Sequence, residues 1–135
     1  MGERLLAEAR AAKAYGLAAA HLGDVAPVVV ISSDPEAGDY LVLYNPQVVA
    51  MAGESEKGEE GSVSLPGIRV EIDRPIWVEV AFMDADGAAR TTRFERFAAR
   101  VALHEIEQMQ GIFFLQRLSR LKRERALKKA KKLSG

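Results

Sequence analysis

The chain has 135 residues, no cysteine, and 19 basic and 19 acidic residues that give a formal net charge of zero. This length predicts one domain over 1–135, with enough buried surface to fold without disulfide bonds. The lack of cysteine excludes disulfides, thiolate metal sites, thiol nucleophiles and iron–sulfur clusters, and the 48% hydrophobic content excludes wholesale disorder.

The N-terminal part of the chain predicts a helix followed by a β-hairpin. Residues 3–15 are rich in alanine with a narrow apolar stripe, so we expect a helix that Gly16 ends or turns. Residues 27–33 form a β-branched run, and the turn-forming residues 34–39 connect it to a second apolar run over 40–44. Two such runs around a short turn are typical of a hairpin.

The middle of the chain predicts more strands. Residues 52–61 are rich in Gly and Glu, which indicates a loop. From 67 to 82 apolar residues alternate with polar ones, and the interruption at Arg74-Pro75 predicts two strands or one bent strand. Residues 84–87 are a hairpin turn that leads to a return strand over 91–94.

Two helices are expected after the strands. Over 95–109 the spacing becomes helical, with Phe97, Val101 and Ile106 on the face that should pack into the core. A last helix over about 117–132 has an apolar stripe opposite a basic face. The stripe consists of Leu118, Leu121, Leu127 and Ala130. Strands in the middle and long helices late in the chain predict an α+β fold.

The last helix concentrates the positive charge of the chain. Residues 117–135 have a net charge of +8, whereas residues 1–116 have a net charge of −8. A solvated helix is one interpretation of this pattern, and a surface for a polyanion is the other. The candidate contact residues are Arg117, Arg120, Arg123, Lys128 and Lys129.

The helix over 95–109 also holds part of a metal-binding pattern, in residues 103–111 (Leu-His-Glu-Ile-Glu-Gln-Met-Gln-Gly). A His-Glu-x-x-His helix directs two imidazoles at one metal, with the Glu beside them as a general acid or base. Here His104 and Glu105 are present, but Gln108 stands in place of the second His. Taken alone, the fragment also fits a polar pair on an amphipathic helix.

Together with two other stretches, this helix resembles the motifs of the peptide deformylase family. Residues 59–67 (Glu-Glu-Gly-Ser-Val-Ser-Leu-Pro-Gly) resemble the family's Glu-Gly-Cys-Leu-Ser-x-Pro motif. Residues 16–23 (Gly-Leu-Ala-Ala-Ala-His-Leu-Gly) resemble Gly-x-Gly-Leu-Ala-Ala-x-Gln, and the helix resembles His-Glu-x-Asp-His. The three occur in the family's order, and the resemblance covers about residues 10–130. We expect the segment that usually precedes the family's first helix to be missing.

The resemblance implies a compact α+β domain with antiparallel sheets around a central helix. Deformylases remove the formyl group from the N-terminal formyl-methionine of nascent bacterial and organellar proteins. Their divalent metal, Fe²⁺ or in its place Zn²⁺, Ni²⁺ or Co²⁺, is held by one Cys and two His, and a metal-bound water attacks the formyl carbon. The helix Glu handles protons, and a Gln side chain and a backbone N–H hold the oxyanion. The family's C-terminal helix docks on the ribosome.

The family's metal ligands correspond here to Ser62, His104 and Gln108. A serine hydroxyl and a neutral amide are poor substitutes for a thiolate and an imidazole on iron or zinc. Glu107 replaces the Asp of the helix motif and is one methylene longer. We therefore expect a degenerate site with no metal bound.

The other site residues carry over with one substitution. Glu105 corresponds to the general base, and Val63 supplies the backbone N–H of the oxyanion hole. His21 replaces the oxyanion Gln. Gly16 belongs to the first motif, and Arg69 aligns with an arginine that helps hold the substrate peptide.

Two rebuilt sites are alternatives. His21 and His104, completed by Glu105 or Gln108, would be an N,N,O metal site. Ser62 with His104 as its base would be a nucleophile, but it needs an orienting carboxylate. Glu105 follows His104 directly and points about 100° away around the helix, so it cannot easily orient that imidazole.

The leading hypothesis is a cytoplasmic, deformylase-like protein with little or no deformylase activity. It would bind the formyl-methionyl nascent peptide in a retained pocket, the ribosome or its rRNA through the basic helix, or both. The alternatives are an active metal-dependent amide hydrolase with altered ligands, and a subunit that regulates an active deformylase. No apolar run is long enough to span a bilayer, so no membrane partner is expected.

Overall fold

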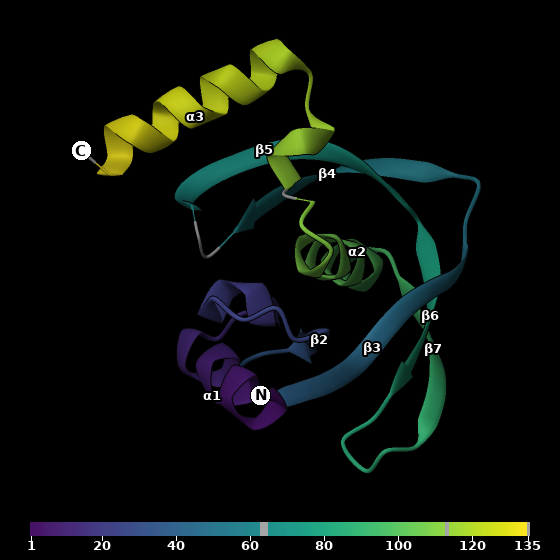
Figure 1. The fold of residues 1–135 in the computed structure, drawn as a ribbon. Coiled ribbons are helices and arrows are strands. Elements are labelled where there is room, and N and C mark those ends of the chain that lie inside the picture. The colour runs from purple at the N-terminus through teal and green to yellow at the C-terminus, as the bar shows by residue number, and fades with distance from the viewer. Residues whose placement is uncertain (63–64, 113, 135) are drawn as a thin grey trace.

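The computed structural model describes residues 1–62, 65–112 and 114–134 (Figure 1). Its helices are α1 (Gly2–Ala12), α2 (Phe97–Met109) and α3 (Arg120–Ser134), with short 3₁₀ helices η1 (Ala19–Leu22) and η2 (Phe114–Arg117). Its strands are β1 (Gly16–Ala18), β2 (Val28–Asp34), β3 (Asp39–Met51), β4 (Ser55–Ser62), β5 (Leu65–Pro75), β6 (Trp77–Met83) and β7 (Ala89–Glu95). The predicted α+β class is confirmed.

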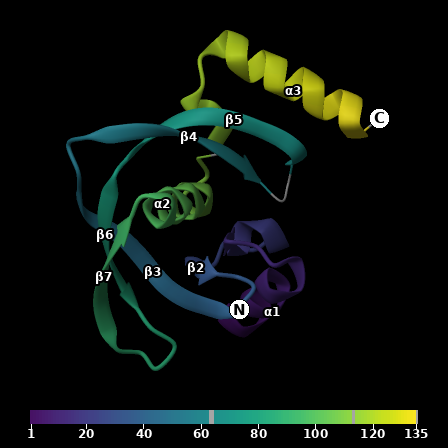
Figure 2. The ribbon, with the colours of Figure 1, turned by 180° about the vertical axis from the view of Figure 1, so that it is seen from behind.

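The strands form two antiparallel sheets with α2 between them. One sheet has the order β1-β2-β3-β6-β7, and β4 pairs with β5 in the other. Figures 1 and 2 show α2 enclosed by the two sheets, with α3 across the outer side of β4 and β5 and α1 at the opposite end of the molecule. The central helix α2 is therefore held between the five-stranded sheet on one side and the β4–β5 sheet on the other.

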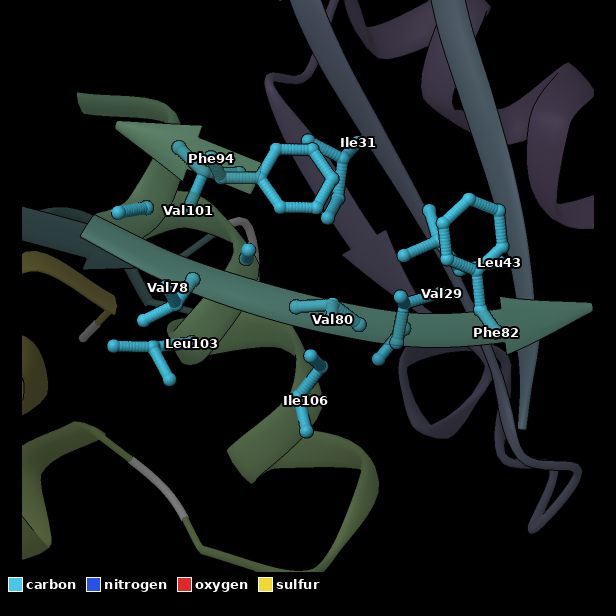
Figure 3. Packing of buried hydrophobic residues seen from close by; sticks show 13 residues of the cluster. Val29, Ile31, Leu43, Val78, Val80, Phe82, Phe94, Val101, Leu103 and Ile106 are labelled. Carbon is cyan, nitrogen blue, oxygen red and sulfur yellow. The ribbon is translucent and has the colours of Figure 1, made fainter. Parts of the chain in front are cut away.

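The main core lies where α2 packs on the five-stranded sheet. Val78, Val80 and Phe82 are buried on β6 and alternate with more exposed residues, because successive side chains of a strand point to opposite faces. Figure 3 shows them beside Leu103 and Ile106 of α2, together with side chains of the neighbouring strands. This packing holds α2, which carries the metal-motif residues, against the sheet.

The predicted core face of α2 is only partly right. Val101 and Ile106 are buried as expected, but Phe97 is 52% exposed. Phe97 is the first residue of α2, and its ring makes an edge-to-face contact with Tyr15 at a centroid distance of 4.8 Å. The helical spacing predicted Phe97 on the core side of α2. Because Phe97 is the first residue of the helix, its side chain lies beyond the end of the buried cluster.

Two local predictions in the first half of the chain are wrong. Lys13 ends α1 in the left-handed conformation, with φ of 49°, so Gly16 does not end the helix but begins β1. The expected loop over 52–61 contains β4, which pairs with β5 from Ser55 onward. The glycines of this segment gave no strand signal in the sequence. Gly58 leaves room for Arg100, because a Cβ at this position would lie 2.7 Å from the guanidinium carbon.

The break at Arg74-Pro75 separates two strands, which is the first of the two predicted arrangements, and the two strands belong to different sheets. β5 pairs with β4, whereas β6 lies between β3 and β7. The hairpins around 34–39 and 84–87 are also confirmed, although β3 runs on to Met51, well beyond the predicted end.

The C-terminal helix packs on β5 through small residues. Ala126 is buried with Ile68, Ile72 and Leu115, and Ala130 lies at the edge of this cluster. Leu121 and Leu127 are 58% and 49% exposed, so half of the predicted apolar stripe points to solvent. Within the described part of the chain, every helix is too short or too polar to cross a bilayer.

Candidate functional site

A cleft of about 320 Å³ lies between β1, the β4–β5 sheet and α2. The three motifs recognised in the sequence meet here. Gly16 comes from the first motif, Glu60 from the second, and His104, Glu105 and Gln108 from the helix. The cleft thus gathers motif residues that lie up to 92 positions apart in the chain (16 to 108).

Glu60 is the centre of a buried network of charges along one wall of the cleft. It is 5% exposed, and its Oε2 accepts hydrogen bonds from Arg74 Nε at 2.7 Å and Arg100 Nη1 at 3.0 Å. Its Oε1 accepts from Arg74 Nη2 at 2.9 Å and lies 2.9 Å from His104 Nδ1. A buried carboxylate with this many charged partners is fully compensated.

The arginines extend the network to the backbone and to the next turn of α2. Arg74 Nη1 donates to Glu107 Oε1 at 2.6 Å. Arg100 donates to the carbonyls of Ile72 at 2.6 Å and Glu56 at 2.8 Å. Glu107 is therefore more than a longer version of the family's Asp, because its carboxylate meets Arg74. Together these bonds tie β4, β5 and α2 into one unit.

The network shifts the pKa values of three of its members, Glu60, His104 and Arg74. Burial raises the pKa of the Glu60 carboxyl, but the hydrogen bonds from Arg74 and His104 outweigh burial and bring this pKa down to about 2. Burial lowers the pKa of the His104 imidazole, but the hydrogen bond to Glu60 and the charge of Glu105 outweigh it and raise this pKa above its ordinary value. Glu60 is thus held ionised, and the protonated form of His104 is favoured.

Glu105 lies in the cleft outside this network. Its side chain is 8% exposed, and it makes no hydrogen bond or ion pair with any residue that the structure describes. Burial raises the pKa of its carboxyl to about 7, against the opposing charge of His104. Gly16 explains how β1 approaches so closely, because a Cβ there would lie 2.9 Å from Glu105 Oε2 and 2.7 Å from Val101 Cγ1.

The structure brings most, but not all, of the predicted site residues to the cleft. Arg69 lines it from β5 with an exposed side chain. His21 is exposed on η1 and is not one of the lining residues, so the His21–His104 metal pair gains no support. Ser62 ends β4, but its side chain is outside the described part of the chain, and Val63 lies wholly outside it.

The sequence reasoning missed the roles of Glu60, Arg74 and Arg100. Glu60 stands in a recognised motif, but its arginine partners are 14 and 40 residues away in the chain. One signal was available, since Arg74 interrupts an apolar alternation just before a proline. The sequence predicted that Glu105 does not easily orient the His104 imidazole but left the orienting carboxylate unidentified. In the structure, Glu60 lies at this imidazole, with its Oε1 2.9 Å from Nδ1.

The donor set does not fit the iron or zinc site that the resemblance implies. A carboxylate on Nδ1 is the usual support of a metal-ligating imidazole, so His104 fits. Gln108 offers a neutral amide, and the chain contains no thiolate. Among the described residues, no group of three or more His, Cys, Asp and Glu side chains is placed to hold a metal ion.

Comparisons with known proteins agree on the family. The model of the polypeptide deformylase family matches residues 1–124. A "Peptide deformylase-like" protein of Rhizobium meliloti is 40% identical over 134 residues, which cover 99% of this chain and 77% of the relative. The crystal structure of a Legionella pneumophila peptide deformylase superposes with a TM-score of 0.89 at 31% identity, over 96% of this chain and 76% of that one.

One further solved structure concerns a ligand. It is a Met-Ala-Ser-bound peptide deformylase of Acinetobacter baumannii, with a TM-score of 0.77 at 28% identity, covering 84% of this chain and 76% of that one. The chain thus spans about three quarters of the length of each of these three proteins. The family model, the sequence similarity and the shared fold all lead to one assignment: the chain belongs to the polypeptide deformylase family.

Proposed function

We propose that this protein binds the N-terminus of a methionyl peptide in the cleft and has little or no deformylase activity. The observation that carries the proposal is the donor set, in which His104 keeps its carboxylate support while Gln108 and the cysteine-free sequence leave no second imidazole and no thiolate. A divalent metal with one strong ligand loses most of the roughly 10–16 kcal/mol that a complete site provides.

The remaining parts of the cleft suit peptide binding. The rings of Tyr15 and Phe97 stand at the cleft, 4.8 Å apart, and offer an apolar, polarisable surface to a methionine thioether. The exposed guanidinium of Arg69 on β5 can donate to peptide carbonyls. The Met-Ala-Ser complex of the Acinetobacter baumannii relative supports a methionyl peptide as the occupant.

Metal content and turnover test the proposal. We expect the purified protein to contain well below one equivalent of iron, zinc, nickel or cobalt, and to show no turnover of a formyl-Met peptide above background, because the ligand set is incomplete. Elemental analysis and an anaerobic formyl-peptide assay with added Fe²⁺ or Ni²⁺ are the measurements.

A repaired variant serves as the positive control. Ser62→Cys with Gln108→His and His21→Gln should recover stoichiometric metal binding, because the walls of the cleft are retained. Stoichiometric metal with turnover in the unmodified protein would contradict the proposal and favour the altered-ligand hydrolase. No metal in the repaired variant would show that the pocket has changed beyond its ligands.

We also propose that α3 binds a polyanion, with ribosomal RNA as its target in the cytoplasm. Lys128 and Lys129 are exposed on α3, where Arg125, Lys131 and Lys132 extend the basic surface. Of the other predicted contacts, Arg120 pairs with Glu124 at 3.1 Å and Arg123 is half-buried. The side chain of Arg117 is outside the described part of the chain.

Charge reversal tests this surface. Lys128→Glu with Lys129→Glu should abolish co-sedimentation with ribosomes, and binding by the unmodified protein should weaken steeply between about 50 and 200 mM salt as counterion release loses its effect. The matched control, Arg4→Glu with Lys57→Glu, makes the same charge change at exposed sites on α1 and β4. Equal losses in both variants, or none in the first, would reject a role for α3. Deletion of the helix is a poorer test, because it uncovers the apolar surface of β5.

A further inference from the structure

The guanidinium of Arg100 occupies a space on β4 that is open because residue 58 has no side chain. A Cβ at Gly58 would lie 2.7 Å from the guanidinium carbon and from Nε of Arg100, and 2.9 Å from Nη2. In this space the guanidinium donates to the carbonyls of Glu56, Gly58 and Ile72 and to the Glu60 carboxylate. The charged end of Arg100 is therefore directed at β4 and β5.

Arg100 also contributes to the wall of the cleft. Six residues of α2 line the cleft, at a spacing that places them along one face of the helix: Phe97, Arg100, Val101, His104, Glu105 and Gln108. Arg100 thus stands between the apolar end, with Tyr15 and Phe97, and the polar end, with His104 and Glu105. Gly58 is not a lining residue, so a guanidinium held over Gly58 lies outside the cleft. If it leaves this space, the cleft is the open volume beside it.

We propose that Gly58 determines which first side chain of a peptide the cleft accepts. By giving the Arg100 guanidinium a place on β4, Gly58 keeps this charge out of the cleft. The apolar end of the cleft is then left to an uncharged side chain such as that of methionine. This inference rests on the proposed function, because it concerns a peptide in the same cleft. Gly58 is a positioning residue, which acts through Arg100 and does not contact the peptide.

A larger residue at position 58 would displace the guanidinium and not the strand. β4 is held by its pairing with β5, whereas the guanidinium is the far end of a flexible side chain. Glu60 keeps Arg74 and His104 as partners when Arg100 moves away. The displaced charge then faces the apolar end of the cleft, where it costs free energy unless an anion pairs with it. An acidic first side chain supplies that anion, and a methionine side chain does not.

Calorimetric titration with two peptides that differ only in the first side chain tests the inference. Met-Ala-Ser and Glu-Ala-Ser are titrated into the full chain. We expect the unmodified protein to bind Met-Ala-Ser at least about tenfold more tightly, because the charge of Arg100 is held on β4. Gly58→Ala should reduce this ratio of affinities by about tenfold or more, by weakening Met-Ala-Ser and strengthening Glu-Ala-Ser.

A double-mutant cycle shows whether the effect passes through Arg100. Arg100→Met keeps an unbranched side chain without the guanidinium, so Gly58→Ala in this background should leave the ratio of the two affinities within about twofold. The matched control is Gly53→Ala, which adds a Cβ at an exposed glycine with no atom beyond its chain neighbours within 4 Å. This control should keep the ratio of the unmodified protein. Far-UV circular dichroism checks that each variant is folded.

The outcomes separate this inference from the proposed function. An unchanged ratio in Gly58→Ala, or equal weakening of both peptides, would overturn the inference and leave methionyl-peptide binding intact. The same change of ratio with and without the guanidinium would overturn the role of Arg100 and the inference with it. Failure of the unmodified protein to bind either peptide would overturn the proposed function itself. A gain in affinity for Glu-Ala-Ser in Gly58→Ala supports the inference, and a misfolded variant could not show it.

Discussion

Glu60→Gln is expected to lower the free energy of unfolding by about 3–5 kcal/mol, the usual cost of removing one partner from a buried ion pair. The neutral amide keeps the shape of the side chain but leaves Arg74 and Arg100 without the charge that compensates them. Both guanidiniums remain buried, and only Arg74 keeps a second carboxylate, that of Glu107. Urea unfolding at pH 7, followed by circular dichroism, measures the effect.

The neighbouring carboxylate is the matched control. Glu59→Gln changes an exposed residue of the same strand, so the free energy of unfolding should stay within about 0.5 kcal/mol. The imidazole pKa of His104, followed by NMR, is a second measurement. It should fall in Glu60→Gln, because burial lowers this pKa and the variant removes the charge of Glu60 that opposes burial. Equal stability of the two variants would show that Glu60 does not hold the wall together.

Glu105→Gln is expected to stabilise the protein relative to the unmodified chain at high pH. The pKa of the Glu105 carboxyl is raised from 4.5 to about 7 in the folded state, so the folded state binds this proton more tightly than the unfolded state does. The stability that this group contributes is complete below about pH 4.5 and is lost as pH rises through 7. A shift of this size corresponds to about 3 kcal/mol, and the amide does not ionise.

The measurement is the difference in unfolding free energy between the two proteins at pH 5 and pH 8. This difference should move by about 2.5 kcal/mol in favour of the variant. His104 also loses stabilising protonation as pH rises, but it is present in both proteins, so its direct contribution largely cancels. Glu71→Gln, at an exposed site, should show no such trend. A constant difference across this range would mean that the Glu105 carboxyl is not buried as described.

The sequence predicts the features of this protein that depend on local patterns, and it misses those that depend on contacts between distant residues. The class, both hairpins and α2 follow from local periodicity, and the three motifs identify Gly16, His104, Glu105 and Gln108 as neighbours. β4 was missed because strands are predicted from β-branched and aromatic side chains, and this segment consists of Gly, Glu, Ser and Lys. Gly58 serves Arg100, which is 42 residues further along the chain, so the reason for the residue lies outside any local window.

The buried network could not be predicted for the same reason. In the sequence, Glu60, Arg74 and Arg100 look like ordinary charges of a loop, a strand end and a helix. Their burial depends on how β4, β5 and α2 pack, and charged residues are rarely buried unless they pair. In contrast, the exposed Leu121 and Leu127 were wrongly placed because a helix of this composition has two plausible faces, and the smaller Ala126 lets α3 lie close to β5.

The arrangement of the network also bears on how such a protein can diverge. The walls of the cleft are joined by Glu60, Arg74, Arg100 and Glu107, and none of these stands at a position that ligates metal in the family. Apart from His104, which contacts Glu60, the side chains that join the walls are therefore distinct from those at the family's ligand positions. Ligand positions can change over generations, and the recess they once served keeps its shape and remains open to a new use.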